Sequence, residues 1–228
     1  MLDIKKQKTN STTLLEVRNL KTSFFTPTGE VKAVNDISYY VNKKEIVAIV
    51  GESGHAAKMS QLSVLQLIQS PPGKILDGKI YFNGINLLEF KKNSREMRQI
   101  RGNDISIIFQ EPMTSLNPVF TVGYQISDVI KTHMEVNKKT AWGIGVKSLE
   151  KVDIPDAFQR MKYYPFQLSG GMCQRVMIAM AIANPTKLII ADEPTTALDV
   201  TTQAHIMELL ISLVQELNTS LVIVTHNL

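Results

Sequence analysis

The stretch Leu188-Ile-Ile-Ala-Asp192-Glu193 decides the fold class of this chain. A short apolar run followed by two adjacent carboxylates predicts a buried strand that ends in acidic side chains. In sheets of parallel strands, ligands bind outside the carboxyl ends of the strands, so Asp192 and Glu193 lie where a ligand is expected. A strand end whose acids simply meet solvent would show the same pattern, and the stretch alone does not separate the two interpretations.

The residues upstream of this strand, Leu168-Ser169-Gly170-Gly171-Met172-Cys173-Gln174, open a predicted helix over Gly170–Ala183. Backbone N–H groups of the Ser-Gly-Gly turn at a helix N-terminus would bind an anion, and the helix dipole adds to the attraction. Two glycines also let a phosphate approach without a Cβ in the way. A bare Ser-Gly-Gly turn means little, but its place before the Asp-Glu strand and Ala197-Leu198-Asp199 makes the pattern specific.

Predicted strands and helices alternate along the chain. The strands are expected at Leu14–Leu20, Val34–Val41, Glu45–Val50, Ile80–Phe82, Ile105–Phe109, Leu188–Ala191 and Ser220–Thr225. The helices are expected at Met59–Ile68, Gly170–Ala183 and Thr201–Leu217, with a more polar helical region from about Val119 to Gln167. This alternation predicts an α/β fold with a mainly parallel sheet.

Some of these elements carry more specific expectations. Leu14–Leu20 and Val34–Val41 alternate apolar and polar residues, which predicts an antiparallel pair joined across Thr26–Gly29. Glu45–Val50 is a continuous β-branched run, typical of a strand buried on both faces. Asn83-Gly84 predicts a hairpin turn after the fourth strand.

The helix expected at Met59–Ile68 has a helical spacing of apolar residues. Leu62, Leu65 and Ile68 are expected to share one side of that helix.

Composition narrows the class of protein. The chain has 228 residues, 44% hydrophobic content and a net charge of +4, which suits a globular protein. Lysine pairs such as Lys91–Lys92 have no interleaved aromatic residues, so they indicate solvated surface rather than a nucleic-acid site. The single cysteine, Cys173, excludes an internal disulfide and a self-contained cysteine metal site.

The sequence also bears on location. No apolar run reaches the ~18 to 20 residues needed to cross a bilayer. Residues 1–13 are polar, lack the apolar middle of a signal peptide and are expected to form a flexible leader. These features predict a cytoplasmic protein.

Five motifs, in this order along the chain, resemble those of the ATP-binding subunits of ABC transporters. Gln110, in Ile107-Ile-Phe-Gln-Glu-Pro-Met, resembles the Q-loop glutamine, and Leu168–Gln174 resembles the signature motif. Leu188–Pro194 resembles the Walker B strand and Ala197–Asp199 the D-loop. His226, in Val-Thr-His, resembles the switch histidine.

This resemblance covers about residues 14–228 and implies a P-loop NTPase-type α/β fold. Such a fold has a mainly parallel sheet core, an antiparallel β subdomain and an inserted helical subdomain, here at about residues 119–167. Gln110–Pro118 and Tyr164–Gly171 are typical of the dipeptide/oligopeptide and nickel importers. Members of that branch continue beyond the switch histidine, so the chain is expected to be truncated at its C-terminus relative to the family.

The resemblance implies that the ligands are ATP and Mg²⁺. Asp192 would hold the metal, and Glu193 would orient or deprotonate the attacking water. Gln110 would sense the γ-phosphate and Mg²⁺ and couple them to the helical subdomain. His226 would contact the γ-phosphate.

Further ATP contacts are implied in the same way. Phe24, or alternatively Phe25, would stack on adenine, although core packing would also explain either ring. Two such domains would enclose two ATP molecules. Each would be bound by one chain's phosphate loop and Asp192-Glu193 region and by the other chain's Ser169, Gly170 and Gly171, with Asp199 as a further nucleotide-binding residue.

The phosphate loop departs from the family pattern Gly-x-x-x-x-Gly-Lys-Ser/Thr. It reads Gly51-Glu52-Ser53-Gly54-His55-Ala56-Ala57-Lys58. Ala56 stands at the second glycine, Ala57 at the lysine and Lys58 at the Mg²⁺-binding hydroxyl. The backbone donors and two glycines remain, so weak nucleotide binding is expected, while efficient hydrolysis is not.

Two details of this loop and the signature stay open. Ser60 lies two positions beyond the place of the missing hydroxyl and is expected to face elsewhere. Cys173 stands where a long polar residue is usual in the family, so it either alters a partner-facing surface or packs as a small residue.

The sequence therefore predicts an ATP-binding, energy-coupling subunit of an ABC importer for peptides, with impaired hydrolysis. Its partners would be a second ABC ATPase subunit in a homo- or heterodimer and transmembrane permease subunits, with an extracytoplasmic substrate-binding protein acting indirectly and no nucleic acid. It would lie peripherally on the cytoplasmic face of the membrane. The alternative is a nucleotide-binding module without turnover, paired with an intact ABC partner. A soluble ABC protein of DNA repair or translation ranks lower because the chain shows neither tandem domains nor coiled-coil insertions.

Overall fold

The computed structural model describes residues 12–51, 55–196 and 198–226. The chain folds into two compact units. The first unit comprises residues 1–101 and 222–228, and the second comprises residues 102–221.

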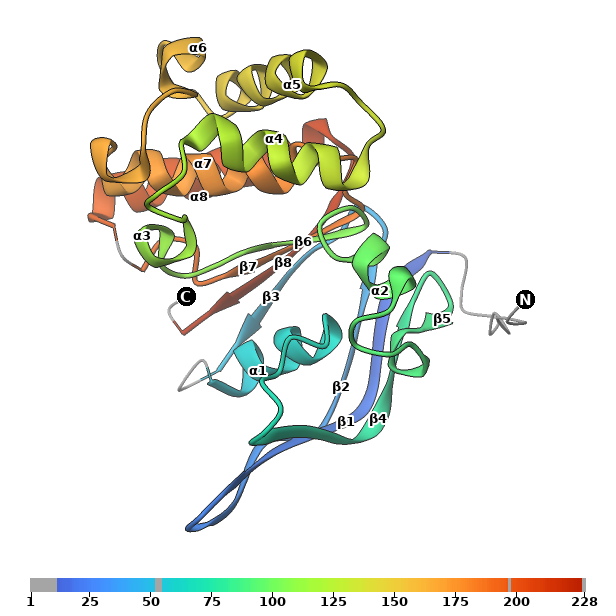
Figure 1. Cartoon of the computed structure of the whole chain (residues 1–228). Helices are drawn as coiled ribbons and strands as arrows, with labels where there is room; N and C mark the ends of the chain where they lie inside the picture. Colours follow the sequence, from blue (N-terminus) through green and yellow to red (C-terminus); the bar gives the residue numbers. More distant parts are fainter. Residues whose placement is uncertain (1–11, 52–54, 197, 227–228) are drawn as a thin grey trace. The chain divides into compact units, whose positions relative to one another are not determined.

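The first unit contains an antiparallel sheet with the strand order β2-β1-β4-β5 (Figure 1). Its strands are β1 (Thr13–Thr26), β2 (Gly29–Asn42), β4 (Gly73–Phe82) and β5 (Ile85–Asn86). Thr26 faces Gly29 at the tip of the β1–β2 hairpin, which confirms the predicted join. Asn83 and Gly84 both have positive φ (49° and 78°), as the turn expected after Ile80–Phe82 requires.

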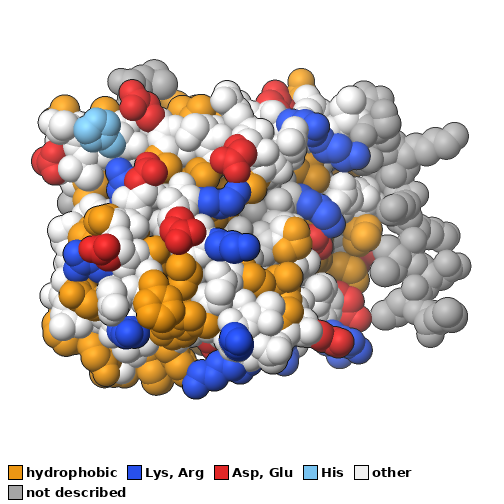
Figure 2. Space-filling view, turned by 90° about the horizontal axis from the view of Figure 1, so that it is seen from above, with side chains coloured by type: hydrophobic (Ala, Val, Ile, Leu, Met, Phe, Trp, Pro, Cys, Tyr) orange, Lys and Arg blue, Asp and Glu red, His pale blue; other side chains and the backbone are white. Residues whose placement is uncertain are grey.

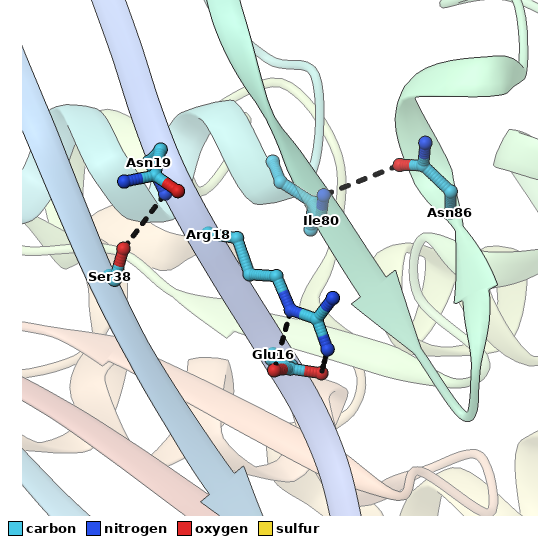
Figure 3. A network of polar contacts seen from close by, with 6 residues as sticks. All are labelled: Glu16, Arg18, Asn19, Ser38, Ile80 and Asn86. Carbon is cyan, nitrogen blue, oxygen red and sulfur yellow. Dashed lines mark hydrogen bonds and ion pairs between the residues drawn. The ribbon is translucent and has the colours of Figure 1, made fainter. Parts of the chain in front are cut away.

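A bulge in β1 bends this sheet. The pairing register with β2 shifts between Val17 and Leu20, and Asn19 there has a φ of 47°. The Asn19 N–H donates to Ser38 Oγ at 2.8 Å, which holds the bulge against β2 (Figure 3). Beside it, the Arg18 guanidinium donates to both oxygens of Glu16, at 2.7 and 2.9 Å.

Helix α1 (His55–Val64) packs against β1 and β2 within the first unit (Figure 1). It begins earlier and ends earlier than the predicted helix at Met59–Ile68. Of the three apolar residues expected on one side, Leu65 and Ile68 are buried and Leu62 is half-buried, and Ser60, Gln61 and Ser63 are buried as well. Gln61 and Ser63 have hydrogen-bond partners on β2 and β1.

The remaining elements of the first unit include a correction. They are β3 (Ile46–Val50), the short helices η1 (Leu87–Glu89) and α2 (Arg95–Ile100), and the end of β8 (Ser220–Thr225). Strand β3 was predicted to be buried on both faces, and this is wrong, because Ile46, Ala48 and Val50 are exposed. Among the described residues β3 pairs only with β8, and its exposed side chains alternate with half-buried ones, so one face of the strand has little cover.

The second unit builds helices over parallel strands. Strands β6 (Ile105–Ile108) and β7 (Leu188–Asp192) pair in parallel, and the Ser220 N–H at the start of β8 donates to the Lys187 carbonyl at 3.0 Å. Every residue of β7 is buried, as predicted for Leu188–Ala191.

The helices of the second unit are α3 (Pro112–Ser115), α4 (Val122–His133), α5 (Lys138–Lys151), α6 (Ala157–Arg160), η2 (Pro165–Gln167), α7 (Gly170–Ile182) and α8 (Val200–Glu216). Helices α4 and α5 lie beside one another over α7, which in turn contacts β6 and α8 (Figure 1). The helix predictions for 170–183 and 201–217 are therefore confirmed to within a residue. The predicted limits of the leader and of the helical subdomain stay predictions.

Two features concern the surface. On the face seen in Figure 2, Lys and Arg side chains are interspersed with Asp and Glu, while hydrophobic side chains gather toward one margin. Within the part of the chain that the structure describes, no helix combines the length and apolar character needed to span a bilayer.

Candidate functional site

Glu193 is the centre of a hydrogen-bonded group in the second unit. Its Oε2 accepts a hydrogen bond from Gln110 Nε2 at 2.8 Å and another from Thr196 Oγ1 at 2.9 Å. Gln110 follows β6 and Glu193 follows β7, so the parallel pairing of these strands brings the two residues to the same edge. The structure therefore joins two residues that lie far apart in the sequence and that the motifs had linked only by analogy.

The backbone at this strand end is constrained. Glu193 has a φ of 44°, a left-handed conformation that costs a residue with a Cβ about 1–2 kcal/mol. The two hydrogen bonds to its carboxylate help to hold that conformation. Asp192, the last residue of β7, is 2% exposed, so its carboxylate points away from bulk water while Glu193 is half-buried.

The Ser-Gly-Gly turn caps helix α7. Ser169 is the N-cap residue, and its Oγ accepts a hydrogen bond from the Met172 N–H at 3.3 Å. A Cβ added to Gly170 would lie 3.7 Å from Leu198 Cδ2, and one added to Gly171 would lie 3.0 Å from Thr202 Cγ2. The turn thus lies against the residues that begin α8.

Asp199 caps the next helix in the same way. Its Oδ1 accepts from the Thr202 N–H at 3.0 Å, and its Oδ2 accepts from Thr202 Oγ1 at 2.7 Å. The hydrogen bond from the Thr202 side chain, followed by the bond from its backbone, lowers the pKa of the exposed Asp199 carboxyl. Thr202 therefore contacts both Asp199 and the region of Gly171.

Cys173 packs inward. Its side chain is fully buried, and its Sγ donates to the Pro165 carbonyl at 3.4 Å. Burial raises the pKa of this thiol, which keeps it protonated. Of the two interpretations left open by the sequence, the structure supports the small core residue.

The first unit carries the other predicted site residues. The Gly51 N–H donates to the Thr225 carbonyl at 3.4 Å, which joins the end of β3 to the end of β8, where exposed His226 follows. Phe24 is partly buried and lies 2.9 Å from the position that a Cβ on Gly73 would take. Phe25 is 50% exposed, so either ring has a face accessible to a ligand.

The loop substitutions fall at the start of α1. Glu52, Ser53, Gly54 and the side chain of His55 lie outside the described residues. Ala56 is exposed within the helix and has no positive φ, so alanine adds no backbone strain at the position of the second glycine.

Ser60 does not take the place of the missing hydroxyl. Ala57 is 5% exposed and Lys58 is half-buried. Ser60 is 1% exposed, and its Oγ donates to the Ala57 carbonyl at 2.8 Å, so it faces the core as its position predicts.

The donor set bears on the metal. Among the described residues, no group of three or more His, Cys, Asp or Glu side chains could hold a metal ion by itself. Asp192 and Gln110 nevertheless offer carboxylate and amide oxygens, which suit Mg²⁺ when phosphate oxygens and water complete its shell. These two side chains of the second unit therefore fit a phosphate-bound Mg²⁺.

Sequence reasoning missed two contributors. Thr196 supports Glu193, and Thr202 joins Asp199 to the glycine turn. Each threonine lies three residues after the carboxylate it contacts. This spacing was the available signal, since a polar side chain at a helix cap or turn often bonds to the residue three positions later.

Comparison with known proteins places these features in a family. The profile of the family described as ABC transporter matches residues 34–196. The chain is 50% identical over 216 residues to the oligopeptide transport ATP-binding protein AppD of Bacillus subtilis (strain 168), covering 95% of this chain and 65% of AppD. It is 49% identical over 215 residues to the dipeptide transport ATP-binding protein DppD of Escherichia coli (strain K12), covering 94% of this chain and 65% of DppD.

The chain thus spans 65% of the length of these two relatives. Among solved structures, the ATP-binding cassette MJ0796, a dimer in a post-hydrolysis state bound to ADP and Pi, superposes with a TM-score of 0.80. Its sequence is 26% identical, and the match covers 94% of this chain and 88% of that chain.

Proposed function

Because the chain belongs to the ABC transporter ATP-binding family, we propose that it is the energy-coupling subunit of an importer for peptides and that its own phosphate loop is impaired in hydrolysis. The observation that carries the proposal is the contrast between two parts of the site. The Gln110–Glu193–Thr196 group has the hydrogen bonds of an ordered site. The loop has Ala57 and Lys58 where a lysine and a hydroxyl belong.

The acidic strand end would act on water and metal. Bound Mg²⁺ would neutralise charge that develops on the phosphates. Asp192 and Gln110 would hold that metal. Glu193 would orient the attacking water, and the hydrogen bonds from Gln110 and Thr196 would keep its carboxylate in one position.

The loop would bind nucleotide without promoting its hydrolysis well. Ala57 brings no charge to the β- and γ-phosphates, and Lys58 would oppose the metal that a hydroxyl would bind. Ser60 cannot compensate, because its hydroxyl is buried and donates to the Ala57 carbonyl. Both substitutions would reduce neutralisation of the negative charge on the phosphates, on which catalysis of phosphoryl transfer depends.

The partner would complete the site. The N–H groups at the start of α7 and the cap of α8 would face a nucleotide held by a second ABC subunit. In a homodimer both phosphate loops would carry the substitutions. In a heterodimer with an intact loop, one competent site would remain, and this chain would contribute Ser169, Gly170 and Gly171 to it, so a heterodimer accounts better for the retained signature turn.

Membrane subunits would bind an aromatic surface on the second unit. It consists of Met113, Val119, Phe120, Tyr124, Tyr164 and Phe166, all of them exposed. The ring centroids of Phe120 and Tyr124 are 4.6 Å apart, and those of Tyr164 and Phe166 are 5.5 Å apart, both pairs stacked. The Val122 N–H donates to the Tyr163 carbonyl at 2.8 Å, which joins the two segments. Exposed aromatic clusters of this kind favour a protein contact, and docking to a permease would place the chain on the cytoplasmic face of the membrane, with a substrate-binding protein acting from the other side.

The test compares the chain with a restored-loop variant carrying Ala56→Gly, Ala57→Lys and Lys58→Ser. ATP affinity and hydrolysis are measured for each alone and with permease subunits co-expressed. We expect the restored loop to raise the hydrolysis rate by about 10²-fold or more, as for the return of one transition-state donor. Hydrolysis by the unaltered chain at the restored variant's rate would contradict the proposal.

The alternative is a nucleotide-binding module without turnover, favoured by the same Ala57 and Lys58. It predicts that the unaltered chain binds ATP with no measurable hydrolysis, alone or with permease subunits, whereas the energy-coupling subunit proposed above hydrolyses ATP slowly. Glu193→Gln in the restored variant is the matched control, because it removes the proposed catalytic carboxylate and leaves the loop unchanged.

A further inference from the structure

The buried face of α1 carries three polar side chains beside Ala57 and Val64, and this departs from the usual apolar face by which a helix packs on a sheet. Ser60, Gln61 and Ser63 are at most 1% exposed, and they face β1 and β2 of the first unit. Burying polar groups costs free energy unless they are hydrogen-bonded. These three side chains are therefore expected to have hydrogen-bond partners that offset the cost of their burial.

The contacts form a chain from β2 to the first turn of α1. Gln61 Nε2 donates to the Tyr39 hydroxyl at 2.9 Å and lies 3.3 Å from Ser60 Oγ. Ser60 Oγ in turn donates to the Ala57 carbonyl at 2.8 Å. The chain thus ends at the position where the family carries its phosphate-binding lysine.

The polar groups at the β2 end of this hydrogen-bonded series are shielded from water. Tyr39 keeps some solvent exposure over the residue as a whole, while desolvation of its hydroxyl raises the pKa of Tyr39 to about 12. Gln61 Oε1 is buried and has no hydrogen-bond partner among the described residues. An unsatisfied buried acceptor lowers stability, so the Gln61 amide is held here at a cost, as expected when a polar group sets geometry rather than adding stability.

A second polar contact anchors the same helix one turn further on. Thr22 Oγ1 on β1 lies 3.0 Å from Ser63 Oγ, and both residues are buried. Ser63 Oγ also donates to the Met59 carbonyl at 2.7 Å. This anchor is similar in chemistry and burial, but it does not reach the first turn of the helix.

We propose that Tyr39 is a positioning residue, which holds the first turn of α1 through Gln61 and Ser60 in the place where nucleotide phosphate binds. Hydrogen bonds are directional, so they select one rotation and one axial position of the helix, whereas apolar contacts tolerate small slides. The part that concerns nucleotide rests on the proposed function. The part that concerns the helix rests on the contacts alone.

The first measurement uses the restored-loop variant as the parent and a fluorescent ATP analogue as the probe. Tyr39→Phe removes only the hydroxyl, and we expect it to weaken nucleotide affinity about 5-fold, the effect of one net hydrogen bond. Gln61→Leu breaks the same chain at its next link and is expected to have a similar effect, with the double variant no weaker than either single variant. Thr22→Val is the matched control, expected to lower Tm but to leave affinity within about 2-fold, since its anchor does not reach the first turn.

The second measurement uses the unaltered loop and needs no nucleotide. Hydrogen exchange of residues 55–60 is expected to rise in Tyr39→Phe and not in Thr22→Val. Equal effects of the two substitutions on both affinity and exchange would overturn the positioning role, as would no effect of Tyr39→Phe on either. If the restored-loop parent does not bind the analogue, the proposed function fails, and the exchange measurement alone then decides the role of Tyr39.

Discussion

Replacement of Gly171 by alanine tests the packing of the signature turn against α8. A Cβ at Gly171 would lie 3.0 Å from Thr202 Cγ2, closer than ordinary contact. At Gly170 the nearest atom, Leu198 Cδ2, would be 3.7 Å away, which is normal van der Waals separation. Neither glycine has a positive φ, so both sites accept an alanine backbone.

The magnitudes follow from two opposing effects. Gly→Ala in a helix stabilises by about 0.5–1 kcal/mol, because alanine has less freedom to lose on folding. Crowding by an added methyl group costs about 1–3 kcal/mol where the neighbour cannot move freely. Gly170→Ala should therefore raise the unfolding free energy. The Gly171→Ala variant should have an unfolding free energy about 1–3 kcal/mol below that of the Gly170→Ala variant, which is the cost of crowding alone.

The assay is urea unfolding followed by circular dichroism, arranged as a double-mutant cycle. Thr202→Ser removes Cγ2 but keeps the hydroxyl that donates to Asp199. Combined with Gly171→Ala, it should recover about 1 kcal/mol beyond the sum of the single changes. Equal unfolding free energies for Gly170→Ala and Gly171→Ala, or a coupling of zero, would refute the reasoning.

Three further outcomes are expected. Thr202→Val should raise the pKa of Asp199, measured by NMR titration. Since that pKa is lowered in the folded state, the stability it contributes is present above the unfolded pKa and is lost as pH falls through the folded pKa. The difference in unfolding free energy between the variant and the unaltered chain should therefore vanish in acid. The Cys173 thiol should resist a colorimetric thiol reagent in the native chain and react once per chain after unfolding, because it is the single cysteine and is fully buried; rapid native labelling would contradict its burial. Gly123→Ala should destabilise by about 1–3 kcal/mol and shift the fluorescence of Trp142, because its Cβ would lie 2.7 Å from Trp142 Cη2, and an unchanged Tm and spectrum would show that the helix pair yields without cost.

Local sequence patterns predicted most elements of the fold. The strand at Leu188–Asp192 and the helix at Gly170–Ile182 follow from an apolar run and from a serine cap before two glycines. These signals act over a few residues, so they survive without knowledge of the neighbours. The error at β3 has the opposite origin, because burial of Ile46 and Val50 depends on what lies beside the strand.

Part of the candidate site was also accessible from the sequence. Asp192, Glu193 and the Ser-Gly-Gly turn were identified by residue type and order, and the substitutions at Ala57 and Lys58 are visible in the sequence itself. Their partners were not, because Thr196 and Thr202 carry no motif of their own, and their roles depend on loop conformations.

The acidic end of strand β7 shows the division clearly. By itself the sequence determined that two carboxylates end a buried strand, because the apolar run before them has no other stable place than a core. Only the tertiary structure decided that Glu193 accepts from Gln110, since parallel pairing of β6 and β7 is what brings those two residues within 2.8 Å. The same holds for α1, where the sequence showed apolar residues at helical spacing, but only the structure showed that Gln61 and Ser63 are also buried, with hydrogen-bond partners in Tyr39 and Thr22.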